Sequence, residues 1–125
     1  DLLAGGDGDQ TLLSGAGGDT LVGGAGADTF RLDAAGDSLP DAPDRIRDFA
    51  QGEDRVDVSR LSAPGRPPFA WLGSDGFTAS GAAEARQDLD GGSTRLLLDA
   101  DGDGEADAVV AFQGAVPLTT ADLVL

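Results

Sequence analysis

The first 31 residues repeat a nine-residue unit, and this period constrains the fold more than any other feature. Residues 5–13, 14–22 and 23–31 read GGDGDQTLL, SGAGGDTLV and GGAGADTFR. Residues 1–4 match the end of an earlier unit, and a degenerate fifth unit over residues 32–40 keeps Asp37 and Leu39 in register. A fixed short period is the signature of a repeat architecture, because one unit cannot bury a core alone.

Each unit predicts a turn followed by a short strand. Glycine at the second and fourth places permits positive φ and a tight bend, and triplets such as residues 20–22, Thr-Leu-Val, favour β structure. If two units form one coil of a solenoid, residues eighteen apart stack at the strand spacing of about 4.8 Å. This stacking predicts Leu3 over Leu21 and Leu12 over Phe30 in the centre.

The same stacking brings acidic turns together. It places Asp1 near Asp19, Asp19 near Asp37, and the turn of residues 5–10 against that of residues 23–28. Two unit charges about 4.8 Å apart repel by about 0.9 kcal/mol in water, and more near a protein, yet residues 1–28 include no basic residue. A cation is therefore expected there. Carboxylate and carbonyl oxygens in an irregular arrangement favour Ca²⁺ over Mg²⁺ or Zn²⁺.

Composition excludes several function classes. The 125 residues suit one domain, and 8 basic against 23 acidic residues give a net charge of −15, which disfavours nucleic acid as a partner. The chain has no His, Cys, Met, Tyr or Lys, so disulfides, Cys/His zinc sites and Ser-His or Cys-His catalysis are excluded. No apolar run approaches the roughly 18 residues of a membrane span. We expect no catalytic residue here and no membrane insertion.

The repeat units resemble the GGxGxDxUx repeat of RTX (hemolysin-type) calcium-binding proteins. The stretches that follow, DSLPDAPDRIRDF at residues 37–49 and GEDRVDVS at residues 52–59, resemble the segment after the repeats in serralysin-type metalloproteases. Similar stretches close alginate epimerase modules. The resemblance covers nearly the whole chain and implies an all-β fold, with a parallel β-roll over residues 1–39 and a capping antiparallel β-sandwich over residues 40–125.

By position, the resemblance implies several Ca²⁺ ions between turns two units apart. Carbonyls at the second and fourth places and the sixth-place carboxylate would hold them. One pair of turns would supply Gly6, Gly8, Gly24, Gly26 and Asp28; the other would supply Gly15, Gly17, Asp19 and Asp37, with Asp44 seven residues further on. Gln10 replaces a sixth-place aspartate, so an ion beside it depends on the Gln10 amide oxygen or on Asp9.

A second acidic cluster occupies residues 99–107. Asp99, Asp101 and Asp103, followed by glycine, copy the first half of an EF-hand loop, but Val110 stands where that loop needs a bidentate glutamate. Strand-like flanks predict a β-hairpin loop instead. Two interpretations stay open: a calcium site that also includes Asp107, or a solvated acidic turn.

Outside the repeats, apolar patterns predict strands at residues 55–59 and 69–72, and a hairpin of residues 85–89 and 94–98 that turns at residues 91–92. Arg45, Arg47 and Arg55 stand among acidic residues and are expected to be ion-paired on the surface. Residues 118–125 suit an edge strand that packs Leu123 and Leu125. They also resemble the uncleaved C-terminal signal of type I secretion substrates, and both readings can hold.

The favoured hypothesis is a non-catalytic calcium-binding module at the C-terminus of a bacterial type I secreted protein. The chain starts within a repeat and without Met, so we expect an upstream catalytic domain in the same parent chain, that of a serralysin-like zinc metalloprotease. An ABC transporter would be a transient partner. Extracellular Ca²⁺ at about 10⁻⁴ to 10⁻³ M would drive folding after export. The alternative is a calcium-dependent polysaccharide-binding or adhesion module of an epimerase- or lyase-type secreted protein.

Overall fold

The computed structural model describes residues 2–13, 15–34, 37–61, 69–90, 92–114 and 116–125. The described residues form β-strands joined by turns and loops, with a short 3₁₀ turn at residues 120–122. In chain order the elements are β1 (Leu2–Ala4), β2 (Thr11–Leu13), β3 (Thr20–Val22), β4 (Thr29–Arg31), β5 (Asp44–Ile46), β6 (Arg55–Asp57), β7 (Ala70–Trp71), β8 (Glu84–Asp90), β9 (Ser93–Asp99), β10 (Ala108–Gln113), η2 (Thr120–Asp122) and β11 (Leu123–Val124). The all-β prediction is confirmed.

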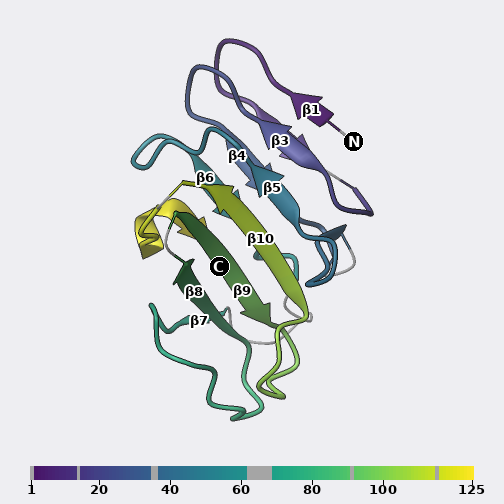
Figure 1. Cartoon of the computed structure of the whole chain (residues 1–125), viewed down its shortest axis with the longest axis vertical. Helices are drawn as coiled ribbons and strands as arrows, with labels where there is room; N and C mark the ends of the chain where they lie inside the picture. The colour runs from purple at the N-terminus through teal and green to yellow at the C-terminus, as the bar shows by residue number, and fades with distance from the viewer. Residues whose placement is uncertain (1, 14, 35–36, 62–68, 91, 115) are drawn as a thin grey trace.

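The repeat units coil as their period predicts. Strand β1 pairs in parallel with β3, with Leu3 opposite Leu21, and β2 pairs in parallel with β4, with Leu12 opposite Phe30. Both pairs join residues eighteen apart, so two nonapeptides make one coil of a parallel β-roll. Figure 1 shows the coils stacked at the N-terminal end of the molecule.

The next coil has a different offset, and here the predicted stacking of Asp37 on Asp19 is wrong. Strand β5 pairs with β3 and puts Ile46 opposite Leu21, 25 residues away instead of 18. The Asp19 N–H accordingly donates to Asp44 Oδ1 at 2.9 Å. The fifth unit lacks the glycine pair of the others, so the chain makes a longer excursion before it returns to the sheet.

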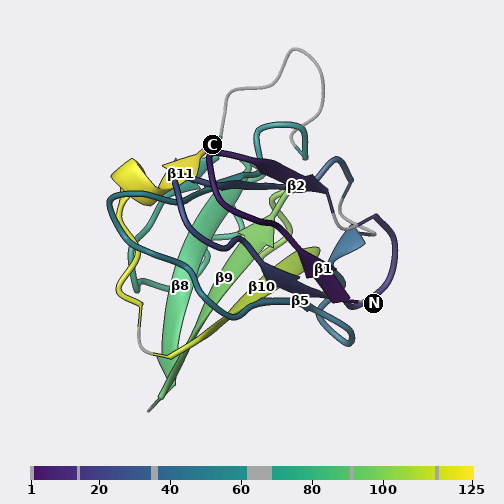
Figure 2. The same ribbon diagram turned by 90° about the horizontal axis from the view of Figure 1, so that it is seen from above.

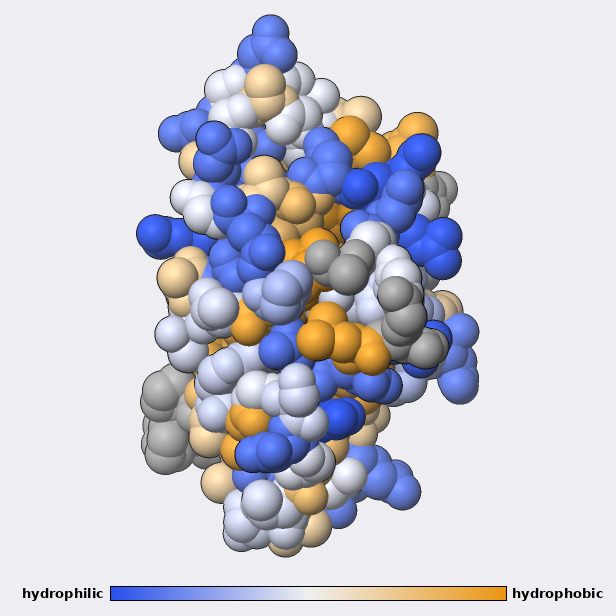
Figure 3. Space-filling model, turned by 60° about the vertical axis from the view of Figure 1, so that its left-hand side comes forward, coloured by the Kyte–Doolittle hydropathy of each residue, from blue (hydrophilic) through white to orange (hydrophobic). Residues whose placement is uncertain are grey.

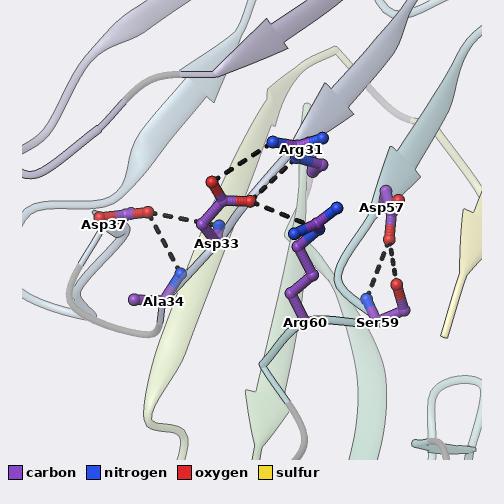
Figure 4. Close-up of polar contacts among 7 residues, drawn as sticks. All are labelled: Arg31, Asp33, Ala34, Asp37, Asp57, Ser59 and Arg60. Atoms are coloured by element: carbon purple, nitrogen blue, oxygen red, sulfur yellow. Dashed lines mark hydrogen bonds and ion pairs between the residues drawn. The ribbon is translucent and has the colours of Figure 1, made fainter.

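Asp37 lies within that excursion. Its Oδ2 accepts hydrogen bonds from the backbone N–H groups of Asp33, at 3.3 Å, and Ala34, at 3.2 Å (Figure 4). Asp33 in turn pairs with Arg31 and Arg60 in the same view. Asp37 therefore closes a local turn. The stacking of Asp1 on Asp19 concerns a residue outside the described part of the chain.

Two sheets face each other across the core (Figures 1 and 2). The larger has the order β1-β3-β5-β10-β9-β8-β7 and the smaller the order β11-β6-β4-β2. The antiparallel strands β8, β9 and β10 extend the larger sheet beyond the roll. Strands β5 and β6 continue the roll past residue 39, so the two units expected from the sequence share both sheets.

One continuous core joins the roll to the antiparallel strands. Leu21, Phe30 and Ile46 from the roll and Phe112 from β10 are almost fully buried between the sheets. Phe49 lies between two of them, with its ring centroid 5.1 Å from that of Phe112 and 6.2 Å from that of Phe30. Burial of such large side chains contributes about 1.5–3 kcal/mol each to stability. The stability of the roll therefore depends in part on the antiparallel strands that cover its apolar side chains.

The strands predicted after the repeats are present. Strands β8 and β9 form the expected hairpin, with Leu89 opposite Thr94; residue 91 of its turn and the loop of residues 64–68 lie outside the described residues. Strand β11 pairs with β6 at the edge of the smaller sheet, with Leu123 buried and Leu125 packed against the core. The edge-strand prediction for the C-terminal residues is thus confirmed.

The described residues include no helix long and apolar enough to cross a membrane. On the face drawn in Figure 3, hydrophobic side chains lie in small groups separated by hydrophilic ones. Such scattered apolar groups are ordinary on a protein surface in contact with water.

Substitution of two glycines with nearly the same backbone geometry tests the stacking. Gly26 has φ 100° and Gly17 has φ 98°, but a Cβ on Gly26 would lie 2.7 Å from the Gly8 carbonyl carbon, whereas one on Gly17 meets nothing within 4 Å. Gly17→Ala is expected to lose about 1–2 kcal/mol of unfolding free energy to backbone strain, and Gly26→Ala about 1–3 kcal/mol more to overpacking. Urea unfolding in excess Ca²⁺ measures both losses, and equal losses would contradict the stacked turns.

Candidate metal centre

The turns of residues 5–10 and 23–28 are in direct contact. A Cβ on Gly24 would lie 2.5 Å from the carbonyl oxygen of Gly6, and one on Gly26 would lie 2.8 Å from that of Gly8. Gly24 and Gly26 both have positive φ, which only glycine adopts readily. The four glycines named from the repeat therefore occupy two stacked turns, as the eighteen-residue offset predicts.

Asp28 ends the second of these turns and is 1% exposed. Its Oδ1 accepts a hydrogen bond from the Gln10 N–H at 3.1 Å, from the turn stacked on it. Its Oδ2 is buried and has no hydrogen-bond partner among the described residues. A buried carboxylate oxygen without a hydrogen-bond donor destabilises the fold unless a cation or another partner binds it.

The electrostatic surroundings of Asp28 add to that cost. Burial raises the pKa of its carboxyl above the ordinary value, and the hydrogen bond from Gln10 opposes this effect. The neighbouring carboxylates of Asp54, Asp48 and Asp9 raise this pKa further. A divalent cation would offset both effects, because its positive charge stabilises the ionised carboxylate and it accepts the free oxygen lone pairs. The donor set of stacked carbonyls and a buried carboxylate fits Ca²⁺.

Two further carboxylates, which the repeat pattern did not reveal, hold the second turn in place from the next coil. Asp48 accepts hydrogen bonds from the N–H groups of Gly23, at 2.9 Å, and Gly24, at 2.8 Å. Asp54 accepts one from the Asp28 N–H at 2.9 Å. The separation of Asp48 from Gly23 is 25 residues, the same as that of Asp44 from Asp19. Once Asp44 is matched to Asp19, adding the same offset of 25 residues to Gly23 identifies Asp48.

The two polar residues weighed as substitutes in the first turn bond to backbone. Gln10 Oε1 accepts a hydrogen bond from the Gly6 N–H at 2.9 Å, within its own turn. Asp9 Oδ1 accepts one from the Ala27 N–H at 2.8 Å, across to the stacked turn. Asp9 thus lies on the side of the first turn that faces the second turn. Gln10 stabilises the first turn through its hydrogen bond with Gly6.

The second pair of turns combines residues 15–19 with residues 39–44. Gly15 and Gly17 have positive φ, and a Cβ on Gly18 would lie 3.1 Å from the Ala42 carbonyl oxygen. Asp19 and Asp44 are both buried and adjacent. The structure therefore brings Asp44 to this pair of turns and leaves Asp37 in its local turn.

The loop of residues 99–107 connects β9 and β10, with Leu98 opposite Ala108, so the β-hairpin prediction is confirmed. Asp99, Asp101, Asp103 and Asp107 each place one carboxylate oxygen within 4.8 Å of the others. Asp99 is fully buried, which raises the pKa of its carboxyl.

Backbone N–H groups of the same loop donate hydrogen bonds to its buried aspartate, Asp99. The two oxygens of Asp99 accept hydrogen bonds from the N–H groups of Gly102, at 2.9 Å, and Gly104, at 2.8 Å. Asp107 accepts one from the Ala100 N–H at 2.8 Å. Backbone N–H groups of the loop bond to its carboxylates, as in a solvated acidic turn, while four carboxylate oxygens lie close enough together for a calcium site. Both interpretations drawn from the sequence therefore stay open.

Comparisons with known proteins agree with these features. The family model described as peptidase M10 serralysin C terminal matches residues 5–125. Metalloprotease AprA of Pseudomonas entomophila is 38% identical over 94 residues, which are 72% of this chain. The chain spans only 19% of the length of that relative.

Two solved structures of modules from the Azotobacter vinelandii mannuronan C5-epimerase are also similar. The AlgE6R3 subunit has a TM-score of 0.66 and 34% identity, over 99% of this chain and 67% of that one. The AlgE6R2 subunit has a TM-score of 0.58 over 100% of this chain and 92% of that one, and its 23% identity shows the fold alone. With stacked nonapeptide turns and a family match over residues 5–125, this chain belongs to the serralysin C-terminal family of peptidase M10 and carries RTX-type repeats in a parallel β-roll.

Proposed function

We propose that this chain is the calcium-binding, non-catalytic C-terminal module of a bacterial type I secreted protein, a serralysin-like zinc metalloprotease. The observation that carries the proposal is Asp28, whose buried Oδ2 has no hydrogen-bond donor among the described residues and lies between two stacked glycine turns. The family match and the metalloprotease relative support the assignment to a protease. The catalytic domain would precede this module in the parent chain.

The residues that would hold the ions come from both pairs of stacked turns. The first site would use the Asp28 carboxylate and the carbonyls of Gly6, Gly8, Gly24 and Gly26. The second would use the carboxylates of Asp19 and Asp44 and the carbonyls of Gly15 and Gly17. Ca²⁺ accepts six to eight oxygen ligands in flexible geometry, which suits carbonyls from two turns better than the strict octahedron of Mg²⁺ does. At the first site the ion would neutralise the buried carboxylate of Asp28, whose neighbours Asp54, Asp48 and Asp9 are also acidic.

Calcium would act as a folding switch for this module. Without it, the charge of −15 and the entropy cost of ordering the glycine turns oppose the coiled state. Because Ca²⁺ binds the folded state only, folding and binding form one equilibrium. In the low Ca²⁺ of the cytosol the chain would stay unfolded and pass through an ABC transporter. Extracellular Ca²⁺ at about 10⁻⁴ to 10⁻³ M would then fold the module and stabilise its parent.

The position of the C-terminal segment agrees with export of an unfolded chain. In the fold, β11 lies beside β6 and Leu123 is buried. Upstream, the Leu118 N–H donates to Gln87 Oε1 at 2.7 Å and the Val116 N–H donates to Thr94 Oγ1 at 2.8 Å. A transporter could therefore contact the buried Val116, Leu118 and Leu123 only before the module folds.

A Ca²⁺ titration followed by far-UV circular dichroism tests the switch. We expect the spectrum of a disordered chain in EDTA and a β-sheet spectrum at millimolar Ca²⁺, because the ion offsets the repulsion between the stacked turns. Equal concentrations of Mg²⁺ are the control and should leave the spectrum disordered. Identical spectra in EDTA and Ca²⁺ would exclude calcium-driven folding.

The substitution Asp28→Asn tests the first site. Asparagine keeps the size of the side chain and the acceptor for the Gln10 N–H but removes the charge. We expect the Ca²⁺ midpoint of folding to rise at least about tenfold, equivalent to about 1.4 kcal/mol. Asp7→Asn is the matched control, since Asp7 is an exposed carboxylate in the stacked turn. The placement of the ligands is wrong if both variants have the wild-type midpoint.

Digestion from the C-terminus tests whether the fold encloses the proposed export signal. A serine carboxypeptidase, which needs no metal, should release Leu125 and Val124 rapidly in EDTA and at least tenfold more slowly in millimolar Ca²⁺, as followed by mass spectrometry. A synthetic peptide of residues 116–125 controls for any effect of Ca²⁺ on the protease. Equal release rates from the module in the two buffers would show that folding leaves this end accessible.

A further inference from the structure

Three arginines share the outer face of the larger sheet, in a chain with a net charge of −15. On β5, Arg45 is exposed between the buried Asp44 and Ile46, and Arg47 is exposed just after the strand. On β9, Arg95 is exposed and its two neighbours are buried. Because successive side chains of a strand point to opposite faces, the outward side chains lie on the face away from the core. We call Arg45, Arg47 and Arg95 the arginine face.

Sheet register sets the spacing of the arginine face. Arg45 and Arg95 both lie opposite Ala111 on the intervening strand β10, so their backbones are two strand spacings apart, about 10 Å. The small Ala111 side chain between them leaves a hollow of about 300 Å³, which Arg45, Arg95, Ala111 and Gln113 help to line. Arg47 lies just past the end of β5, but its N–H donates to the Leu21 carbonyl at 3.0 Å, as the Arg45 N–H donates to the Asp19 carbonyl at 2.8 Å. The chain therefore stays paired with β3 through residue 47, which places Arg47 about 7 Å from Arg45 along the strand direction.

Among the described residues, none of the three arginines of the arginine face makes an ion pair with an acidic side chain. The sequence predicts ion pairs for Arg45, Arg47 and Arg55 with acidic neighbours, but within the described residues the ion pairs join Arg31 and Arg60 to Asp33 (Figure 4). Strand alternation explains the difference for Arg45, because the adjacent Asp44 points inward and bonds to Asp19.

We propose that the arginine face binds an extended acidic segment of another polypeptide, with one carboxylate at each arginine. In an extended peptide, side chains on one side recur about every 7 Å, the spacing of Arg45 and Arg47. The guanidinium fork matches a carboxylate with two parallel hydrogen bonds. Arginine is also enriched among residues that anchor protein interfaces. This inference goes beyond the calcium-dependent function and requires only the folded sheet.

Two features of the surroundings limit the partner. Nucleic acid carries a charge every 1.7 Å or so along its axis, which is far denser than the charges of the arginine face, and the net charge of −15 opposes every acidic partner, the proposed peptide included. Asp88 lies opposite Arg95 on β8 and is exposed, so it weakens the positive potential on that side. Exposed ion pairs are weak and screened by salt. The binding is therefore expected to be weak, salt-sensitive and centred on Arg45.

Fluorescence anisotropy with a labelled peptide of alternating Glu and Ser tests this proposal on the Ca²⁺-loaded module. The double variant Arg45→Gln/Arg95→Gln should lose affinity at least tenfold, whereas Arg31→Gln/Arg60→Gln, which removes the same charge from residues outside the arginine face, should stay within twofold of wild type. Arg45→Lys keeps the charge but loses the fork and should be intermediate. Raising the salt from 50 to 300 mM should weaken wild-type binding severalfold.

Absence of peptide binding, or equal losses in the two double variants, would show that the arginine face is not a peptide site. Tighter binding of a uronic acid oligosaccharide or of single-stranded DNA of equal charge would assign the face to another class of polymer. Circular dichroism of the same Ca²⁺-loaded samples reports separately on calcium-driven folding, so a failure of that function is distinguished from a failure of the arginine face.

Discussion

The close contact between acidic glycine turns is the constraint on which the rest of the structure depends. The turns stack so tightly that a single methyl group on Gly24 or Gly26 would overlap the backbone of the turn beside it. At this separation the carboxylate of Asp28 is buried among the oxygens of neighbouring turns. Close backbone packing and the burial of negative charge thus come from the same geometry, so the same turns build both the fold and the candidate cation site.

The segment after the repeats acts as one more coil of the roll. Asp44, Asp48 and Asp54 reach back to backbone N–H groups of the preceding coil, at Asp19, at Gly23 with Gly24, and at Asp28. Charged acceptors on backbone N–H groups make stronger hydrogen bonds than neutral ones. These three aspartates therefore hold the turns in the stacked arrangement from outside the repeat itself.

The antiparallel strands and the C-terminus complete the same two sheets. Strand β10 continues the larger sheet from β5, and β11 closes one edge of the smaller sheet beside β6. A strand edge exposes unpaired backbone groups, and a neighbouring strand satisfies them. The last residues of the chain consequently pack as part of the folded core.

The nonapeptide period alone determined the coil, the pairing of Leu12 with Phe30, and the meeting of Gln10 with Asp28, because a regular repeat gives equivalent residues equivalent environments. It could not determine the next coil. There the degenerate fifth unit breaks the period, and the tertiary structure decided that Asp44 replaces Asp37 beside Asp19 and that Asp48 and Asp54 accept hydrogen bonds from the second glycine turn. Strand pairing across β10 likewise decided that Arg45 and Arg95 share one face, since long-range register depends on how whole sheets pack and leaves no local trace in the sequence.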